Sequence, residues 1–273
     1  MNEVMMIGSL MFLIGAIVGS FLNVCIVRLP QEQSVVIPRS HCQNCKKTIS
    51  WHDNIPLMSY LFLRGRCRFC GNKFSFLYFF VELLTAVTFL LFYLYYGLTI
   101  LLVPYLFMVC CFIIATLVDF KHRIIPDEVS VGGMAVGLIF SLFIPQLHHV
   151  PLDPQTLYIP YLKSFGLSLM GVLIGGGAIY AMGILGDFLF KKESMGGGDI
   201  KLLAMIGAFL GWKMAILTFF IAPFFGAFYG IIEKLRTNDT AIAYGPFLVI
   251  GALICLFKGD VLLNWILSGY GLY

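Results

Sequence analysis

The sequence predicts an all-α polytopic membrane protein with about eight transmembrane helices. Of its 273 residues, 60% are hydrophobic and only 12% are charged. Soluble domains carry about 25% charged residues, roughly twice this share. The mean hydropathy is +0.92. The apolar residues gather in runs that suit a helical crossing of about 20 residues and exceed the ~10-residue strands of an outer-membrane barrel.

Eight apolar stretches are candidates for these helices. No basic residue precedes the first, and no small-x-small cleavage site closes it, so we interpret it as a retained span and not as a removable signal. The stretch at 200–211 is short for a crossing; it forms a half-length helix or joins the next stretch. The eight lie near residues 5–27, 77–96, 99–118, 129–144, 163–186, 200–211, 213–232 and 241–257.

The distribution of Lys and Arg predicts the orientation. Segment 28–76 holds eight of the 18 such residues. If this segment is cytoplasmic and the spans alternate, 15 of the 18 fall inside, as the positive-inside rule expects. The loop from Ile144 to Tyr161 has none and falls outside. Seven crossings would place Lys234 and Arg236 outside, so the pattern supports eight. The other inside residues are Lys121, Arg123, Lys191, Lys192 and Lys201.

Four of the eight cysteines form two C-x-x-C pairs, separated by 21 residues, in segment 28–76. Two such pairs bring four thiolates to one tetrahedral metal, and Zn²⁺ is the usual occupant. A loop this small has little apolar core, so the metal would supply much of its folding energy and is expected to be structural. Disulfides and unliganded thiols are the weaker alternatives. The predicted ligands are Cys42, Cys45, Cys67 and Cys70.

The remaining candidates for metal or nucleic-acid chemistry receive plainer interpretations. The other cysteines lie within or at the ends of apolar runs and are expected to be small core residues. His122, His148 and His149 lack metal-ligand spacing and are expected to be solvated. The basic residues around the C-x-x-C pairs follow from the positive-inside rule and from adjacent anionic lipid headgroups, so membrane lipids and not nucleic acid are the expected partners.

Asp119 follows an uninterrupted apolar run, where an ionised carboxylate needs a partner, water or a task. Pro126 disfavours helix at the residue before it, so the chain is expected to turn between Asp119 and Asp127. Asp127 then stands where the next helix begins, and an acidic residue there complements the helix dipole. A charge paired with Lys121 or Arg123 is the alternative for Asp119.

Asp199 follows three consecutive glycines, which permit close backbone approach. Gly196 and Gly198 would let this carboxylate lie against another element or a substrate strand. An N-cap of the 200–211 helix is the alternative role. Lys201 is placed to pair with a carboxylate or to face headgroups. The predicted topology puts Asp119 and Asp199 at the same, cytoplasmic, membrane face.

Two nearby carboxylates can share one proton, so that one accepts a proton from water while the other donates one. Water activated in this way attacks a peptide carbonyl, and the acid then assists the leaving amine. The chain shows neither a Ser-His-Asp arrangement nor an HExxH pair. A pair of aspartates is therefore the strongest candidate for catalysis.

In combination and in this order, these motifs are highly specific, and the chain resembles the type IV prepilin leader peptidases, membrane aspartic peptidases with a GxGD motif. The resemblance covers nearly the whole chain. One departure is Tyr78-Phe79-Phe80, where the family commonly has a Tyr-Pro pair. The motifs that carry the resemblance are Gly19–Pro30, the two C-x-x-C pairs, Asn54–Tyr60, Arg64–Arg68, Val81–Thr85, Asp119-x₇-Asp127 ending in Ile-Pro-Asp, and Met195–Leu202.

The resemblance implies that Asp119 and Asp199 are the catalytic aspartates, with Gly196, Gly198, Pro126, Asp127 and Lys201 in support. It implies cleavage of the basic leader of prepilins or pseudopilins of type IV pilus and type II secretion systems, on the cytoplasmic side and after a glycine. It also implies N-methylation of the new N-terminus with S-adenosylmethionine. Segment 28–76 shows no methyl-donor fingerprint, and Glu82 and the neighbourhood of Asn23 and Arg28 are candidates by resemblance alone.

The expected organisation is a first transmembrane helix at 1–27, a cytoplasmic Cys₄ zinc-binding domain at 28–76, which the resemblance implies is the methyltransferase part, and a transmembrane aspartic peptidase domain at 77–273. The expected location is the bacterial plasma or inner membrane. Two alternatives stay open: a peptidase without methyltransferase activity, and a non-catalytic membrane component of a pilus or secretion assembly.

Overall fold

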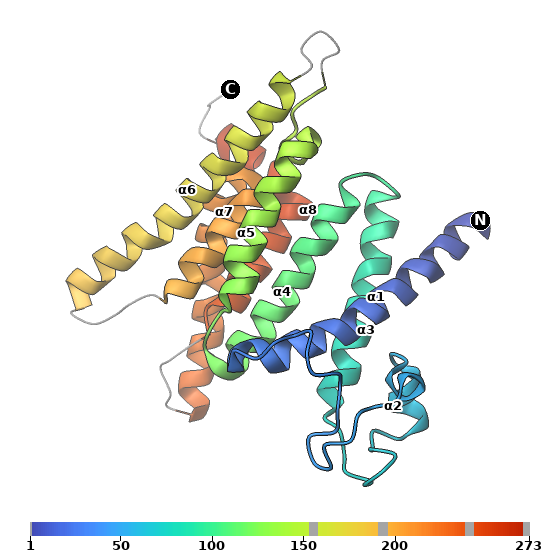
Figure 1. Cartoon of the computed structure of the whole chain (residues 1–273). Coiled ribbons are helices and arrows are strands. Elements are labelled where there is room, and N and C mark those ends of the chain that lie inside the picture. Colours follow the sequence, from blue (N-terminus) through green and yellow to red (C-terminus); the bar gives the residue numbers. More distant parts are fainter. Residues whose placement is uncertain (1, 153–157, 191–195, 238–242, 270–273) are drawn as a thin grey trace. The chain divides into compact units, whose positions relative to one another are not determined.

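The computed structural model describes residues 2–152, 158–190, 196–237 and 243–269. In these residues the regular structure is helical apart from two isolated β-bridges in the cysteine loop (Figure 1). The all-α prediction is therefore confirmed. The helices are α1 (Asn2–Arg28), α2 (Met58–Phe62), α3 (Phe76–Tyr96), α4 (Leu102–His122), α5 (Asp127–Phe143), α6 (Ile159–Phe190), α7 (Gly197–Thr237) and α8 (Gly245–Gly269).

Six of the described helices are long and apolar enough to cross a membrane: α1, α3, α4, α6, α7 and α8. The predicted stretch at 129–144 corresponds to α5, which has 17 residues. The two predicted stretches at 200–211 and 213–232 both fall within α7. Every predicted stretch therefore overlaps one of these helices. Whether the stretches at 200–211 and 213–232 form one span or two depends on the course of α7.

α7 reverses direction at Gly211, whose φ of 78° and ψ of 170° lie outside the helical region. Leu203, eight residues before this point, and Ala215, four residues after it, both lie beside Gly175 of α6. The positive φ is a conformation that glycine adopts without strain. The sequence therefore folds into two antiparallel helical halves here.

α8 confirms this reversal. Its Gly259 lies beside Met214, just after the reversal, whereas its Phe247 lies beside Gly226, further along α7. The second half of α7 is thus antiparallel to α8. With α5 and the two halves of α7, eight helical segments of the described residues match the eight predicted stretches.

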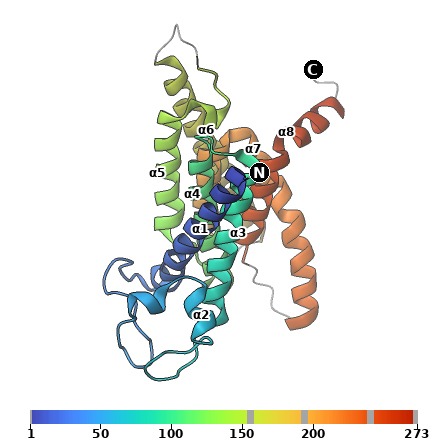
Figure 2. The same cartoon turned by 90° about the vertical axis from the view of Figure 1, so that its right-hand side faces the viewer.

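The chain folds as two compact units, residues 1–106 and 107–273. In the first unit, α1 packs closely along α3. A Cβ at Gly19 would lie 2.7 Å from Glu82 Cα, and one at Gly15 would lie 2.8 Å from Ala86 Cα. No larger residue fits at either position, as in other small-x₃-small membrane contacts. The cysteine loop connects these two helices, and α2 lies beside the first turns of α3 (Figure 2).

In the second unit, α4 and α5 are antiparallel, because Cys111 and Phe107 of α4 lie beside Gly133 and Phe140 of α5 respectively. α5 runs parallel to the first half of α7, where Met205 lies beside Gly133. The end of α4 and the beginnings of α5, α7 and α8 consequently meet at one end of this unit. This convergence gathers the predicted aspartates.

The opposite end of the second unit carries the 3₁₀ turn Pro145–His148. A Cβ at Gly211 would lie 3.3 Å from His148 Nδ1, so this turn covers the reversal of α7. The expectation that His148 is solvated is wrong: its Nε2 is buried without a hydrogen-bond partner among the described residues. Burial lowers the pKa of His148 to about 4. Lys191 and Lys192 lie outside the described residues.

Candidate active site and metal centre

The two C-x-x-C pairs adopt the same backbone turn. Cys42 N–H donates to Lys47 O, and Lys46 N–H donates back to Cys42 O. The second pair repeats this, since Cys67 N–H donates to Asn72 O and Gly71 N–H donates to Cys67 O. Lys46 and Gly71 occupy equivalent positions with φ of 58° and 68°. Each turn holds its two thiols on one side, so local sequence alone forms half of the site.

The four predicted ligands come together in the structure. The sulfur atoms of Cys42, Cys45, Cys67 and Cys70 all lie within 4.8 Å of one another. Cys42 and Cys70 Sγ are 3.8 Å apart, and Cys45 and Cys67 Sγ are 4.0 Å apart. Tetrahedral Zn–S bonds of about 2.3 Å place the sulfurs about 3.8 Å apart. The cluster therefore fits a tetrahedral metal ion, and all four cysteines are free of disulfides.

Backbone N–H groups prepare two of these thiols for ionisation. The N–H of Asn72 lowers the pKa of Cys70 to about 6, and that of Cys45 lowers the pKa of Cys42. The Lys47 N–H acts in the same direction on Cys45, yet burial and the neighbouring thiols raise its pKa to about 11. Four thiolates crowd one another without a cation, so metal binding has to release protons from this cluster.

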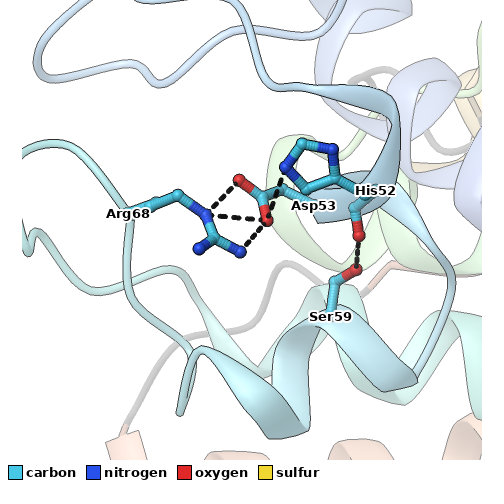
Figure 3. A network of polar contacts seen from close by, with 4 residues as sticks. All are labelled: His52, Asp53, Ser59 and Arg68. Carbon is cyan, nitrogen blue, oxygen red and sulfur yellow. Dashed lines mark hydrogen bonds and ion pairs between the residues drawn. The ribbon is translucent and has the colours of Figure 1, made fainter.

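An ion pair between a half-exposed arginine and a buried carboxylate connects the cysteine loop to its second turn (Figure 3). Arg68 lies between Cys67 and Cys70, and its Nε and Nη2 donate to both carboxylate oxygens of Asp53 at 2.5 to 3.0 Å. The Asp53 side chain is only 5% exposed. The hydrogen bonds from Arg68 lower the pKa of Asp53. Such bidentate pairs fix orientation as well as charge.

Asp119 lies in the last turn of α4 and is 5% exposed. Its Oδ2 accepts a hydrogen bond of 2.9 Å from the backbone N–H of Gly245, the first residue of α8. Arg123, the alternative partner considered for Asp119, interacts with it electrostatically. The carboxylate is therefore held by an element 126 residues away in the chain.

Asp199 lies in the first turn of α7, which begins at Gly197, so it is not the N-cap of that helix. It is half-buried and interacts electrostatically with Asp119. A Cβ at Gly196 would lie 3.3 Å from Asp199 Oδ2, and one at Gly198 would lie 3.1 Å from Ile125 Cβ. The glycines thus allow the beginning of α7 to approach the turn that follows Asp119.

The other predicted residues form a second contact at the same end. Pro126 precedes α5, and its carbonyl accepts hydrogen bonds from Val129 and Ser130 N–H. Asp127 begins α5 and makes an exposed ion pair with Lys201 of α7 at 2.7 Å. Lys201 therefore pairs with Asp127 and not with Asp119 or Asp199. This contact fastens the beginning of α5 to that of α7.

Two further residues at this site, Tyr244 and Gly245, are not among those predicted from the sequence. Gly245 donates to Asp119, and the buried hydroxyl of Tyr244 has no hydrogen-bond partner among the described residues. Burial and the Asp199 charge raise the pKa of Tyr244 to about 12. The signal available was a Gly-Pro pair opening an apolar run, since proline suits the first turn of a helix. That signal marks a helix start but does not reveal a contact with Asp119.

A buried and a half-buried carboxylate, with a backbone N–H that donates to one of them, form an arrangement suited to general acid–base chemistry. One carboxylate can hold a proton while the other accepts one from water.

The side chains that are candidates for methyl-donor binding each make a hydrogen bond with a backbone group. Glu82 accepts from Leu57 N–H, Asn23 donates to Tyr78 O, and Arg28 donates to Ser34 O and Pro38 O.

Two family models match the chain, and they divide it close to the boundary between the two compact units, residues 1–106 and 107–273. The model of the bacterial Peptidase A24 N-terminal domain matches residues 13–96, and that of the type IV leader peptidase family matches residues 106–231. A prepilin leader peptidase/N-methyltransferase of Legionella pneumophila is 35% identical over 91% of this chain and 90% of its own length. A protein of the same name from Bacillus subtilis is 30% identical over 94% and 96%.

A further relative of that name, from Myxococcus xanthus, is 38% identical over 84% of this chain, and the match spans 63% of the relative's length. No solved structure matches the chain. These three matches each cover at least 84% of this chain. The chain belongs to the type IV leader peptidase family.

Proposed function

We propose that this protein is a membrane aspartic endopeptidase that removes the leader of type IV prepilins or pseudopilins, cutting after a glycine on the cytoplasmic side. The observation that carries the proposal is the pair at one end of the second unit, in which buried Asp119 and half-buried Asp199 interact electrostatically. The family match and the names of the relatives support the reaction class.

In the proposed reaction, one aspartate removes a proton from water, and the resulting nucleophile attacks the carbonyl carbon of the glycine that ends the leader. The other aspartate gives its proton to the carbonyl oxygen and then assists departure of the amine. The Gly245 N–H orients Asp119 throughout. Gly196, Gly198, Pro126, Asp127 and Lys201 position the helix ends and take no part in proton transfer.

Single Asp119→Asn and Asp199→Asn variants test this assignment. Each keeps the size of the side chain but removes the carboxylate, so leader cleavage should fall by at least about 10³-fold, the scale on which paired acid–base groups act. Asp187→Asn, at a carboxylate of α6 outside the pair, serves as the control. Cleavage of a synthetic substrate with a basic leader, a glycine and an apolar helix is the measurement. Retained cleavage in both site variants would refute the aspartate pair.

We assign the cysteine cluster to a structural Zn²⁺ held by Cys42, Cys45, Cys67 and Cys70. The sulfur spacing supports a tetrahedral site, and four thiolates leave no open position for substrate. The ion would therefore fold segment 28–76 and supply no chemistry to the peptidase. Metal analysis of the purified protein should give one zinc per chain.

N-methylation of the newly exposed residue with S-adenosylmethionine is the second proposed activity. The names of the relatives support it. Glu82, Asn23 and Arg28, the candidates by resemblance for binding the methyl donor, each make a hydrogen bond to the backbone. Mass spectrometry of the cleaved substrate, with the methyl donor supplied, separates the alternatives. An unmethylated product identifies a peptidase without methyltransferase activity, and an uncleaved substrate favours a non-catalytic assembly component.

We further propose a domain arrangement with the first span at 1–27, the zinc domain at 28–76 and the peptidase domain at 77–273. The protein crosses the bacterial plasma or inner membrane several times, with the cysteine loop and both aspartates facing the cytoplasm. The Lys and Arg distribution supports this orientation. Labelling of cysteines introduced in the loop and at His149 from either side of sealed vesicles tests it.

A further inference from the structure

The cysteine loop exposes large apolar side chains that its metal centre does not use. Trp51 is 77% exposed, Leu61 60% and Phe62 78%. Met58 and Ile55, at 48% and 44%, extend the same short segment. Soluble surfaces rarely gather apolar groups in this way unless a protein or a membrane covers them. We call residues 51–62 the apex segment.

The apex segment is fastened to a transmembrane helix at a defined height. The backbone N–H of Leu57 donates to Glu82 Oε2 of α3 at 2.8 Å. The ring of Tyr60 lies against Phe76 and Phe79, with centroids 6.2 and 5.5 Å apart. Glu82 is six residues into α3, which corresponds to about 9 Å along the helix axis. The apex segment is thus held beside the first two turns of a span.

This distance from the beginning of α3 corresponds to the depth of the boundary between lipid headgroups and acyl chains. Interfacial helices bury their apolar faces about 5 to 10 Å into this boundary, and tryptophan concentrates there. Phe76 and Phe80 at the beginning of α3 are themselves 62% and 43% exposed, so apolar surface continues from the apex segment onto the span. Membrane lipid is the occupant that covers both surfaces at once.

The charges near the apex segment favour the same occupant. Arg64 and Arg66 follow α2 directly and are exposed, and Lys73 precedes α3. Basic groups near an anionic leaflet strengthen binding to it. A substrate with a basic leader would be repelled by these groups, whereas anionic headgroups would be attracted.

We propose that residues 51–62 form a membrane-interface anchor, inserting Trp51, Leu61 and Phe62 into the cytoplasmic leaflet beside α3. The anchor fixes the position of the metal-bound loop relative to the bilayer surface. It adds an interaction surface for anionic lipid to a segment otherwise explained only by metal binding.

Trp51 is itself the reporter for the test. The chain has three tryptophans, so a Trp212→Phe/Trp265→Phe background leaves only Trp51. The full-length protein is reconstituted into vesicles of phosphatidylcholine and phosphatidylglycerol whose chains carry bromine at shallow or deep positions. Shallow bromines should quench Trp51 emission more strongly than deep bromines, because interfacial segments penetrate only about 5 to 10 Å.

Two double variants test the apolar and the charged contributions to lipid binding separately. Leu61→Ser/Phe62→Ser should reduce the quenching at least about twofold while zinc content stays unchanged, which excludes a misfolded loop. Arg64→Gln/Arg66→Gln should reduce it in anionic vesicles only. Trp51 emission that is insensitive to bromine and open to aqueous iodide overturns the anchor. Emission that responds instead to an added apolar substrate helix also overturns it and assigns the surface to substrate.

Discussion

The metal centre and the aspartate pair are built in opposite ways. All four cysteines lie within 29 residues of one another, and two repeated turns present their thiols. Asp119 and Asp199 are 80 residues apart, and the donor that holds Asp119 comes from Gly245. The first site needs an ion to become stable, whereas the second needs four helix ends to converge. A substitution at one site should therefore leave the other site unaffected. Loss of the metal should unfold the cysteine loop, whereas displacement of a helix end should slow leader cleavage.

The largest effect is expected from Cys67→Ser. Structural zinc contributes about 10 to 16 kcal/mol to the folding of small metal domains, so losing one ligand should release the ion and unfold the loop. Limited proteolysis should then cut within 28–76, and metal analysis should show loss of zinc. Cys25→Ala removes a thiol outside the cluster and should keep the metal. Zinc retained at one per chain in Cys67→Ser would contradict the four-ligand site.

Acid should weaken the second unit at the end opposite to the aspartates. The pKa of His148 is about 4 in the folded chain, compared with about 6.5 in an unfolded one. Between these values the unfolded chain binds a proton that the folded chain does not, so stability falls as the pH falls. The loss begins near pH 6.5, approaches about 3 kcal/mol and levels off below pH 4.

Thermal unfolding in detergent from pH 7.5 to 4.5 measures this loss. His148→Gln should flatten the dependence, because glutamine does not titrate, and His149→Asn, at an exposed neighbour with φ of 55°, should leave it intact. The metal loop also responds to acid, so the difference between variants carries the result. Equal pH dependence in His148→Gln and the parent would show that burial of this imidazole is not maintained in solution.

Gly245→Ala should damage the aspartate pair without unfolding it. The added Cβ would lie 2.8 Å from Asp119 Oδ2 and 3.1 Å from Ile125 Cδ1, so the carboxylate or the beginning of α8 must move. Displacement of a catalytic group by about 1 Å costs up to about 100-fold in rate. We expect kcat for leader cleavage to fall about 10- to 100-fold with little change in KM. Gly132→Ala, which meets open space on α5, should cleave normally.

Three patterns in the sequence predicted much of the fold and part of both sites. The cysteine spacing identified the metal site because each turn is closed by hydrogen bonds within six residues. The apolar runs identified the helices because the bilayer sets their length. The Lys and Arg pattern predicted that Asp119 and Asp199 lie at one face, and the helix directions place them at one end of the second unit.

The contacts that complete the aspartate site could not be predicted in this way. Gly245 acts through its backbone N–H, which every residue except proline possesses, so its residue type does not identify Asp119 as the acceptor. The enclosure of His148 depends on the reversal of α7 at Gly211, where two distant segments meet. A single sequence reveals the ends of helices but not which ends come together.

The smallest expected effect belongs to the ion pair between Asp127 and Lys201. Both side chains are largely exposed, at 64% and 42%, so solvent screens their attraction. Exposed pairs contribute about 0.2 to 1 kcal/mol. A double-mutant cycle with Asp127→Asn and Lys201→Met should therefore give a coupling within this range in thermal unfolding, decreasing with added salt. Cleavage should change less than about threefold, because neither group touches the reacting atoms. A loss comparable to that of Gly245→Ala would mean that this pair positions Asp199, and the aspartate site would then extend to its exposed rim.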